Sequence, residues 1–151
     1  MWSGSTEHQN DRERSMALAN LIPHLPPQYQ YVGLQKETLE ADQTVLAAQP
    51  DILHFEDELH DFSDTAALCE LMDRVISVDT SVAHLAGALG RPVWILLPFR
   101  PDWRWLTGRS DTPWYPSARL FRKEQAGSWD GVLQKVKVEL LKISRSLLGK
   151  R

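Results

Sequence analysis

Two short apolar runs flanking a helix-like segment form the clearest pattern along the chain. Residues 75–78 and 93–97 are almost uniformly apolar, which is typical of strands inside a parallel sheet, because helices cover such strands on both faces. Between them, residues 80–89 are predicted to form a helix that ends at Gly90, a position that favours a left-handed residue, before Pro92 blocks further helix.

Weaker patterns along the rest of the chain extend this alternation of helices and strands. Further helices are expected over about 15–24, 37–48, 129–148 and from Ser63 or Asp64 to Met72. Further strands are expected over 29–34 and 119–121, with a short apolar run at 52–55 and loops over 2–14 and 100–116. This order predicts an α/β fold, with a Rossmann-like, doubly wound and mainly parallel sheet.

Length and composition describe an ordinary globular domain. The chain has 151 residues, of which 42% are hydrophobic and 25% charged, so one domain over 1–151 is expected and disorder is disfavoured. It contains neither an apolar run of the roughly 18 residues that cross a bilayer nor a signal-peptide pattern at its start. Its single cysteine, Cys69, has no partner for an internal disulfide. A cytoplasmic location without an integral membrane segment is expected.

The charge is distributed unevenly. Residues 1–75 carry 14 acidic and four basic side chains, a net charge of −10, whereas residues 76–151 carry six acidic and 13 basic ones, a net charge of +7. A chain that is acidic overall is not expected to bind nucleic acid, since that affinity depends on neutralising phosphates. A local basic surface still suits a small phosphorylated ligand. The alternative is solvated charge spread over helix faces.

The sharpest candidate site is the predicted turn between the strand 75–78 and the following helix. Ligands bind beyond the carboxyl ends of parallel strands, and Asp79, Thr80 and Ser81 lie there. Free N–H groups and about half a positive charge at the helix start favour an anion, and Asp79 suits sugar hydroxyls. His84 is expected one turn later on the face of Ser81. The alternative is that Asp79 or Thr80 caps the helix and His84 is an ordinary surface histidine.

Two loops are further candidates. Ser3, Gly4 and Ser5 would form a strand-to-helix turn if a strand preceded them, with Arg12 and Arg14 supplying cations to a diphosphate; otherwise this stretch is a polar terminus. Residues 98–116 contain half of the six tryptophans, which would cover a ligand, dock a second domain or pack internally. They are Trp103, Trp105 and Trp114.

Other chemistries lack their motifs. The chain has no G-x-G-x-x-G, no G-x-x-x-x-G-K-[ST] and no G-x-S-x-G, which disfavours dinucleotide, P-loop and hydrolase sites. His54 and His60 flank acidic residues, but their spacing matches no known metal site and indicates an acidic loop.

Residues 75–94, VISVDTSVAHLAGALGRPVW, together with PDWRW at 101–105 and PWYP at 113–116, resemble the C-terminal domain of glycosyltransferase family 9, the heptosyltransferase-like enzymes. The resemblance is closest to the version found behind tetratricopeptide repeats in bacterial proteins. It implies the donor-binding half of a GT-B fold that binds a nucleotide-sugar donor without metal or other cofactor. Sites carried over by position are Ser3, Gly4, Ser5, Arg14, Gln35, Lys36, Asp79, Thr80, Ser81 and His84.

Within this resemblance, Asp79, Thr80 and Ser81 would hold the diphosphate or sugar, Arg14 would offset phosphate charge, and Gln35 and Lys36 would lie near the nucleoside. Many family members have Gly at the position of Ser81. An N-terminal acceptor domain, the catalytic base and the first strand of the donor domain have no counterpart in the chain, so an inverting transferase fragment is expected. The rival is a non-catalytic nucleotide-binding or interaction module that self-associates through surface exposed around Trp103 and Trp105.

Overall fold

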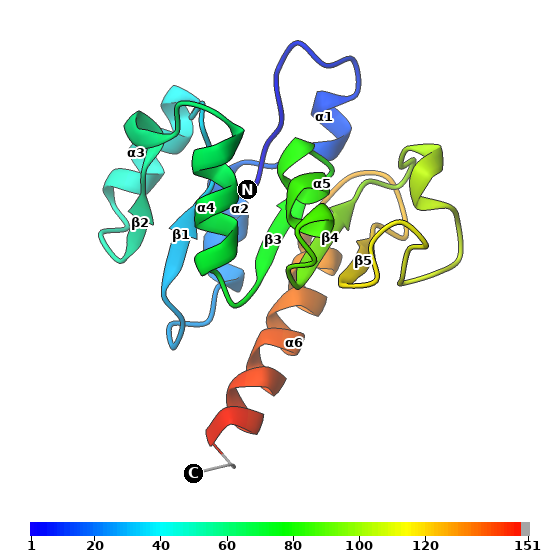
Figure 1. Ribbon diagram of the computed structural model, residues 1–151. Helices are drawn as coiled ribbons and strands as arrows, with labels where there is room; N and C mark the ends of the chain where they lie inside the picture. The colour runs from blue at the N-terminus through cyan, green and yellow to red at the C-terminus, as the bar shows by residue number, and fades with distance from the viewer. Residues whose placement is uncertain (149–151) are drawn as a thin grey trace.

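The computed structural model describes residues 1–148. Five short strands form two sheets: β1 (Tyr31–Gly33), β2 (Ile52–His54), β3 (Val75–Val78), β4 (Val93–Leu97) and β5 (Ala118–Arg122). The α-helices are α1 (Asp11–Arg14), α2 (Leu18–Leu21), α3 (Glu40–Ala47), α4 (Phe62–Leu71), α5 (Ser81–Ala88) and α6 (Asp130–Leu148). Three 3₁₀ turns complete the described chain: η1 (Ile22–His24), η2 (Glu56–Glu58) and η3 (Trp103–Trp105). The elements are arranged as Figure 1 shows.

All paired strands are parallel. The larger sheet has the order β3-β4-β5 and the smaller one pairs β1 with β2. The start of the chain runs beside β3, because the Met1 ammonium donates to the Ile76 carbonyl at 2.8 Å and the Val78 N–H donates to the Met1 carbonyl at 3.1 Å. The first residues therefore lie beside β3, although no strand is assigned to them.

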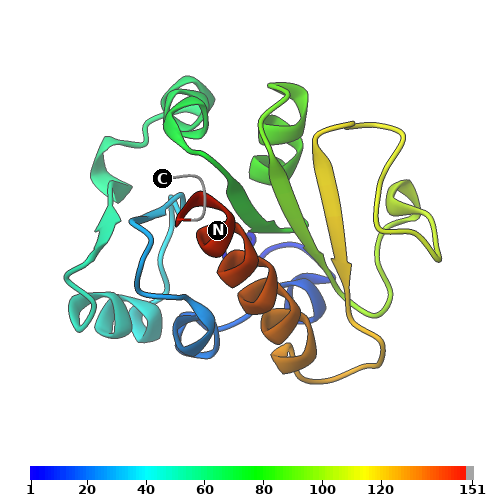
Figure 2. The ribbon, with the colours of Figure 1, turned by 90° about the horizontal axis from the view of Figure 1, so that it is seen from below.

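Helices cover both faces of the three-stranded sheet, as Figure 2 shows with α5 on one side and α6 on the other. Side chains alternate accordingly along β4: Trp94 and Leu96 belong to the core against α6, whereas Val93, Ile95 and Leu97 belong to the core against α5. All five are buried, which confirms a strand that is apolar on both faces. The α/β class with parallel strands is likewise confirmed.

Three expected elements differ from the structure. The helix predicted over 15–24 is broken into α2 and η1, because Pro23 disrupts regular helical hydrogen bonding. The predicted loop 2–14 contains the short helix α1. Helix α4 begins earlier than Ser63, because Asp61 accepts from the N–H groups of Ser63 and Asp64 and completes a capping box.

No helix in the part of the chain that the structure describes is both long and apolar enough to cross a membrane.

Candidate functional site

The turn from β3 into α5 lies at the carboxyl edge of the larger sheet. Thr80 occupies the N-cap position of α5, but its hydroxyl lies 3.1 Å from the Ser77 hydroxyl instead of capping the helix. Thr80 is buried, and Ser81, the first helical residue, is exposed. Because the first N–H groups of a helix precede its hydrogen-bond ladder, Ser81 offers both a backbone N–H and a hydroxyl at this edge. The alternative that Asp79 or Thr80 caps the helix is confirmed for the position of Thr80, which is the N-cap residue, but no side chain makes a capping hydrogen bond there.

Arg14 reaches this turn from the N-terminal loop, 65 positions away in sequence. Its guanidinium Nη1 donates to the Asp79 carbonyl at 3.0 Å, and its Nε lies 3.5 Å from a carboxylate oxygen of Asp11. Gly4 lets the guanidinium pass close to the backbone, since a Cβ at this position would lie 2.4 Å from Arg14 Nη2. Helix α1 accordingly lies beside the start of α5 (Figure 1). A cation and a helix N-terminus thus share one edge of the sheet.

His84 belongs to an aromatic cluster next to the same turn. Its Nε2 lies 3.8 Å from Asp79 Oδ1, and its Nδ1 lies 2.9 Å from the Tyr115 hydroxyl. The imidazole stacks on Trp105, with centroids 5.1 Å apart and an interplanar angle of 23°. The ring is thereby fixed by neighbours on three sides, and its half-exposed edge remains available. His84 is close to Asp79 as expected, but it is an anchored residue and not an isolated surface histidine.

Close packing of Tyr115 on α5 requires Gly87. A Cβ built on Gly87 would lie 2.5 Å from Tyr115 Cγ, so Gly87→Ala is expected to lower the free energy of unfolding by about 1–3 kcal/mol despite the better helix propensity of alanine. Gly131→Ala in α6 is the matched control, because nothing lies within 4 Å of its added Cβ. Urea denaturation of both variants tests this; equal stability of the two would show that Tyr115 does not pack on Gly87.

The remaining predicted site residues are divided between the interior and the surface. Ser3 and Gln35 are buried together, with Gln35 Nε2 2.9 Å from the Ser3 hydroxyl and 3.1 Å from its carbonyl. Gln35 Oε1 has no hydrogen-bond partner within the described residues. Lys36 donates instead to the His60 carbonyl at 2.6 Å, and Ser5 is exposed. Gln35 therefore braces the N-terminal loop, and Lys36 is directed toward the loop before α4.

Two members of this aromatic cluster were not predicted from the sequence: Tyr115 was not identified as a site residue, and Trp105 was not predicted to contact His84. Trp105 is fully buried, whereas Trp103 is 70% exposed, so the expectation that both contribute exposed surface is wrong for Trp105. The spacing of Trp105 after β4 contained no signal of its contact with His84, because that contact depends on the path of the loop. The one sequence feature connected with Tyr115 is the glycine at position 87, because the absence of a side chain there leaves room for the Tyr115 ring.

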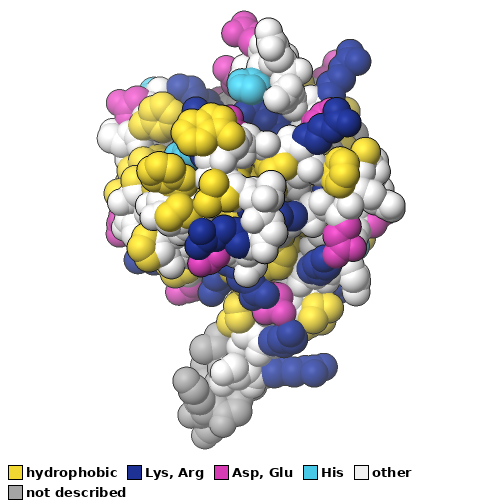
Figure 3. Space-filling model, turned by 90° about the vertical axis from the view of Figure 1, so that its right-hand side faces the viewer, with side chains coloured by type: hydrophobic (Ala, Val, Ile, Leu, Met, Phe, Trp, Pro, Cys, Tyr) yellow, Lys and Arg dark blue, Asp and Glu magenta, His cyan; other side chains and the backbone are white. Residues whose placement is uncertain are grey.

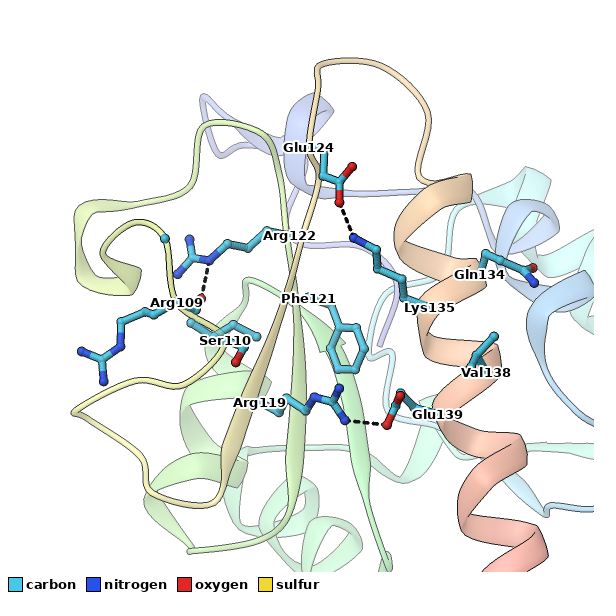
Figure 4. A pocket seen from close by; sticks show the side chains of 12 residues that line it. Arg109, Ser110, Arg119, Phe121, Arg122, Glu124, Gln134, Lys135, Val138 and Glu139 are labelled. Carbon is cyan, nitrogen blue, oxygen red and sulfur yellow. Dashed lines mark hydrogen bonds and ion pairs between the residues drawn. The ribbon is translucent and has the colours of Figure 1, made fainter.

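A separate groove of about 590 Å³ lies between β5 and α6 (Figure 4). Four of the charged side chains that line it form ion pairs with one another. The nitrogen–oxygen distance is 2.7 Å between Arg119 and Glu139 and 2.5 Å between Lys135 and Glu124. Arg122 donates to the Arg109 carbonyl at 2.9 Å. None of the predicted site residues lines this groove. Within residues 1–148, no three His, Cys, Asp or Glu side chains are grouped so as to hold a metal ion.

Comparison with known proteins gives one partial likeness. The chain is 40% identical over 80 residues to Protein FlbA of Caulobacter vibrioides, a match that covers 53% of this chain and 13% of FlbA. The chain thus spans a small part of the length of this curated relative. No model of a known protein family matches the chain, and no solved structure matches it.

These findings correct the family assignment made from residues 75–94. The chain was expected to belong to glycosyltransferase family 9, but FlbA is not a member of that family and no family model supports the assignment. The assignment was wrong because a strand, an acidic turn and a small-residue helix are features that many parallel α/β proteins share.

Proposed function

We propose that the β3–α5 turn binds the diphosphate of a nucleoside diphosphate sugar. The observation that carries this proposal is the contact between Arg14 and the Asp79 carbonyl at 3.0 Å, which brings a guanidinium to the start of α5. Arginine presents planar donors that match phosphate oxygens, and a helix N-terminus favours the same negative charge. The exposed hydroxyl of Ser81 supplies a further donor.

The same edge offers groups suited to the sugar. The Asp79 side chain is 17% exposed and lies beside His84, which is 34% exposed. A carboxylate accepts hydrogen bonds from hydroxyl groups, and the imidazole edge is held in place by Tyr115 and Trp105. We infer that Asp79 and His84 orient the sugar, while Arg14 and the α5 N–H groups bind the diphosphate.

In a sugar transfer, this arrangement would stabilise the departing nucleoside diphosphate. Negative charge increases on the diphosphate as the bond to the sugar breaks, and donors already directed at it lower the barrier without reorganising. We therefore propose the donor-binding half of a metal-independent, inverting glycosyltransferase of GT-B type, with a doubly wound sheet. Its acceptor domain, its catalytic base and any tetratricopeptide repeats would belong to other parts of a parent protein, which we expect to be cytoplasmic.

Replacing Arg14 is expected to weaken nucleotide binding selectively. Calorimetric titration of the chain with UDP, GDP, ADP and CMP and their sugars should find saturable binding of one nucleotide class. Arg14→Gln should lower that affinity by about tenfold to a hundredfold, since a hydrogen bond to a charged group contributes about 1.5–3 kcal/mol.

Arg12→Gln is the matched control. Arg12 was expected beside Arg14 as a second cation, but it lies exposed on helix α1, whereas the Arg14 guanidinium contacts the Asp79 carbonyl. The Arg12→Gln variant should bind the nucleotide as the unaltered chain does. Equal losses in the two variants, or binding that Arg14→Gln leaves unchanged at unchanged stability, would overturn the assignment of the site. Absence of binding by every nucleotide in the panel would instead favour a module that keeps the fold without the ligand.

A further inference from the structure

The segment between β4 and β5 contains a second hollow that the nucleotide site does not use. It has a volume of about 480 Å³ and is lined by Pro101, Asp102, Trp103, Leu106, Thr107 and Arg109. The segment lies outside the sheet beside β4 and β5 (Figure 1). On the face of the molecule shown in Figure 3, hydrophobic side chains lie beside charged ones. The lining of the hollow is mixed as well, with Pro101, Trp103 and Leu106 beside Asp102, Thr107 and Arg109.

Arg122 holds the backbone that surrounds this hollow. From β5 its guanidinium donates to the carbonyls of Leu106 at 3.0 Å and of Arg109 at 2.9 Å, and also to that of Trp105. Trp114 adds a hydrogen bond from its indole N–H to the Arg104 carbonyl at 2.9 Å. These contacts fix a long connection that would otherwise be mobile, and a fixed surface loses less conformational entropy when a ligand binds.

The backbone is strained at the edge of the hollow. Leu106 has φ +54°, the one positive φ at a non-glycine residue among the described positions. A bulky side chain in this region costs free energy and persists where surrounding contacts enforce it. Here the enforcing contact is the Arg122 hydrogen bond to the Leu106 carbonyl. The strain supports a loop shape maintained for recognition, because a relaxed connection between β4 and β5 would not need it.

The side chains of the hollow combine a flat aromatic surface with hydrogen-bonding groups. Trp103 is 70% exposed, although the Arg104 guanidinium lies 5.5 Å from the centroid of its ring. Thr107 contributes a hydroxyl. Asp102 contributes a carboxylate whose Oδ1 already accepts from the Arg104 N–H at 3.0 Å, so its Oδ2 is the oxygen that would bind a ligand. A pyranose ring presents C–H groups that stack on an aromatic face and hydroxyl groups that bind carboxylates. We infer that this hollow binds a saccharide ring stacked on Trp103, with Asp102 and Thr107 bonding its hydroxyl groups.

The charges of the hollow favour a neutral saccharide over an anion. Arg109 forms two hydrogen bonds with Asp111, at 2.6 and 2.8 Å, and Arg104 lies 3.1 Å from Asp102. Each guanidinium therefore lies beside a carboxylate, and these groups give the hollow no excess positive charge that would attract a phosphate or an acidic peptide. A neutral ligand rich in hydroxyl groups does not depend on such a charge.

Titration with neutral sugars tests this inference separately from the nucleotide site. Maltose, cellobiose, lactose and chitobiose are added to the intact chain at millimolar concentrations, and tryptophan fluorescence and calorimetry follow binding. One of them should bind saturably, and Trp103→Ala should lower its affinity about tenfold, as loss of an aromatic contact surface predicts. Trp103→Phe should retain most of the affinity, because it keeps a flat ring.

Phe99→Ala is the control for a general effect of losing an exposed aromatic side chain from this segment. Phe99 is 48% exposed, but it does not line the hollow, so its replacement should leave sugar affinity within about twofold. The inference is overturned if none of the four sugars binds, or if Trp103→Ala and Phe99→Ala weaken binding equally. Because these sugars carry no phosphate, either result leaves the nucleotide proposal unaffected.

Discussion

Trp105→Ala is expected to lower the free energy of unfolding by about 3–5 kcal/mol, the cost of removing a large, fully enclosed aromatic side chain. Trp105 is completely buried in the core on the α5 side of the sheet. It stacks on His84, and its centroid lies 6.4 Å from that of Tyr115. Removal of its ring would leave a cavity between the loop and α5, and His84 would lose one of its supports.

Chemical denaturation measures this loss, and Trp103→Ala is the control. Trp103 lies two residues away on the same turn η3 but is 70% exposed, so its replacement should change stability by less than about 0.5 kcal/mol. Comparable destabilisation by the two substitutions would contradict the packing described for this loop. In the Trp105→Ala variant, the His84 ring should also gain mobility, which its side-chain NMR signals would report.

The stability of the chain is expected to rise as the pH is raised from about 5 to 8, because the Met1 amine is buried. Burial lowers the pKa of this amine from 8.0 to about 5. In the unfolded chain the amine binds a proton below pH 8, whereas in the folded chain it does so only below about 5. The unfolded state therefore binds more protons within this interval, so the free energy of unfolding increases with pH, by at most about 4 kcal/mol.

Urea midpoints measured across this pH interval test the expectation. A chain in which a short Gly-Ser extension precedes Met1 is the comparison, because the extension moves the charged amine away from the Ile76 carbonyl that it contacts at 2.8 Å. All histidines are common to both chains, so the difference between the two pH profiles isolates the amine. Identical profiles would show that the Met1 amine titrates as an exposed group.

The sequence predicted those elements whose hydrophobic pattern is strong. The strands at 75–78 and 93–97 were predicted with their observed bounds, because a strand buried on both faces leaves an uninterrupted apolar run. Helix α6 was predicted within one residue of its start. The helix expected over 15–24 forms only from Leu18 to Leu21 and continues as the 3₁₀ turn Ile22–His24, because its apolar spacing did not reveal the effect of Pro23 or the later start at Leu18.

The sequence predicted the residues of the β3–α5 turn but not the side chains that pack around it. Asp79, Thr80 and Ser81 follow directly from the end of a strand, so their position is a local property. The inward turn of Thr80 toward Ser77 and the stacking of His84 on Trp105 depend on tertiary contacts between distant segments, which spacing does not encode. The sequence analysis predicted Arg14 as a cation for a diphosphate, but the sequence contained no signal of its contact with the Asp79 carbonyl.

The most direct test of the nucleotide site is an NMR titration of the labelled chain with the nucleoside diphosphate that binds in calorimetry. If the diphosphate binds at the β3–α5 turn, the backbone N–H signals of Ser81 and Val82 and the guanidinium signal of Arg14 should shift together and saturate at one affinity. The N–H signals of Gly108 and Val138, which line the groove between β5 and α6 and not this turn, should remain in place. Saturable binding that leaves Ser81, Val82 and Arg14 unshifted would contradict the account, because the diphosphate would then lie elsewhere.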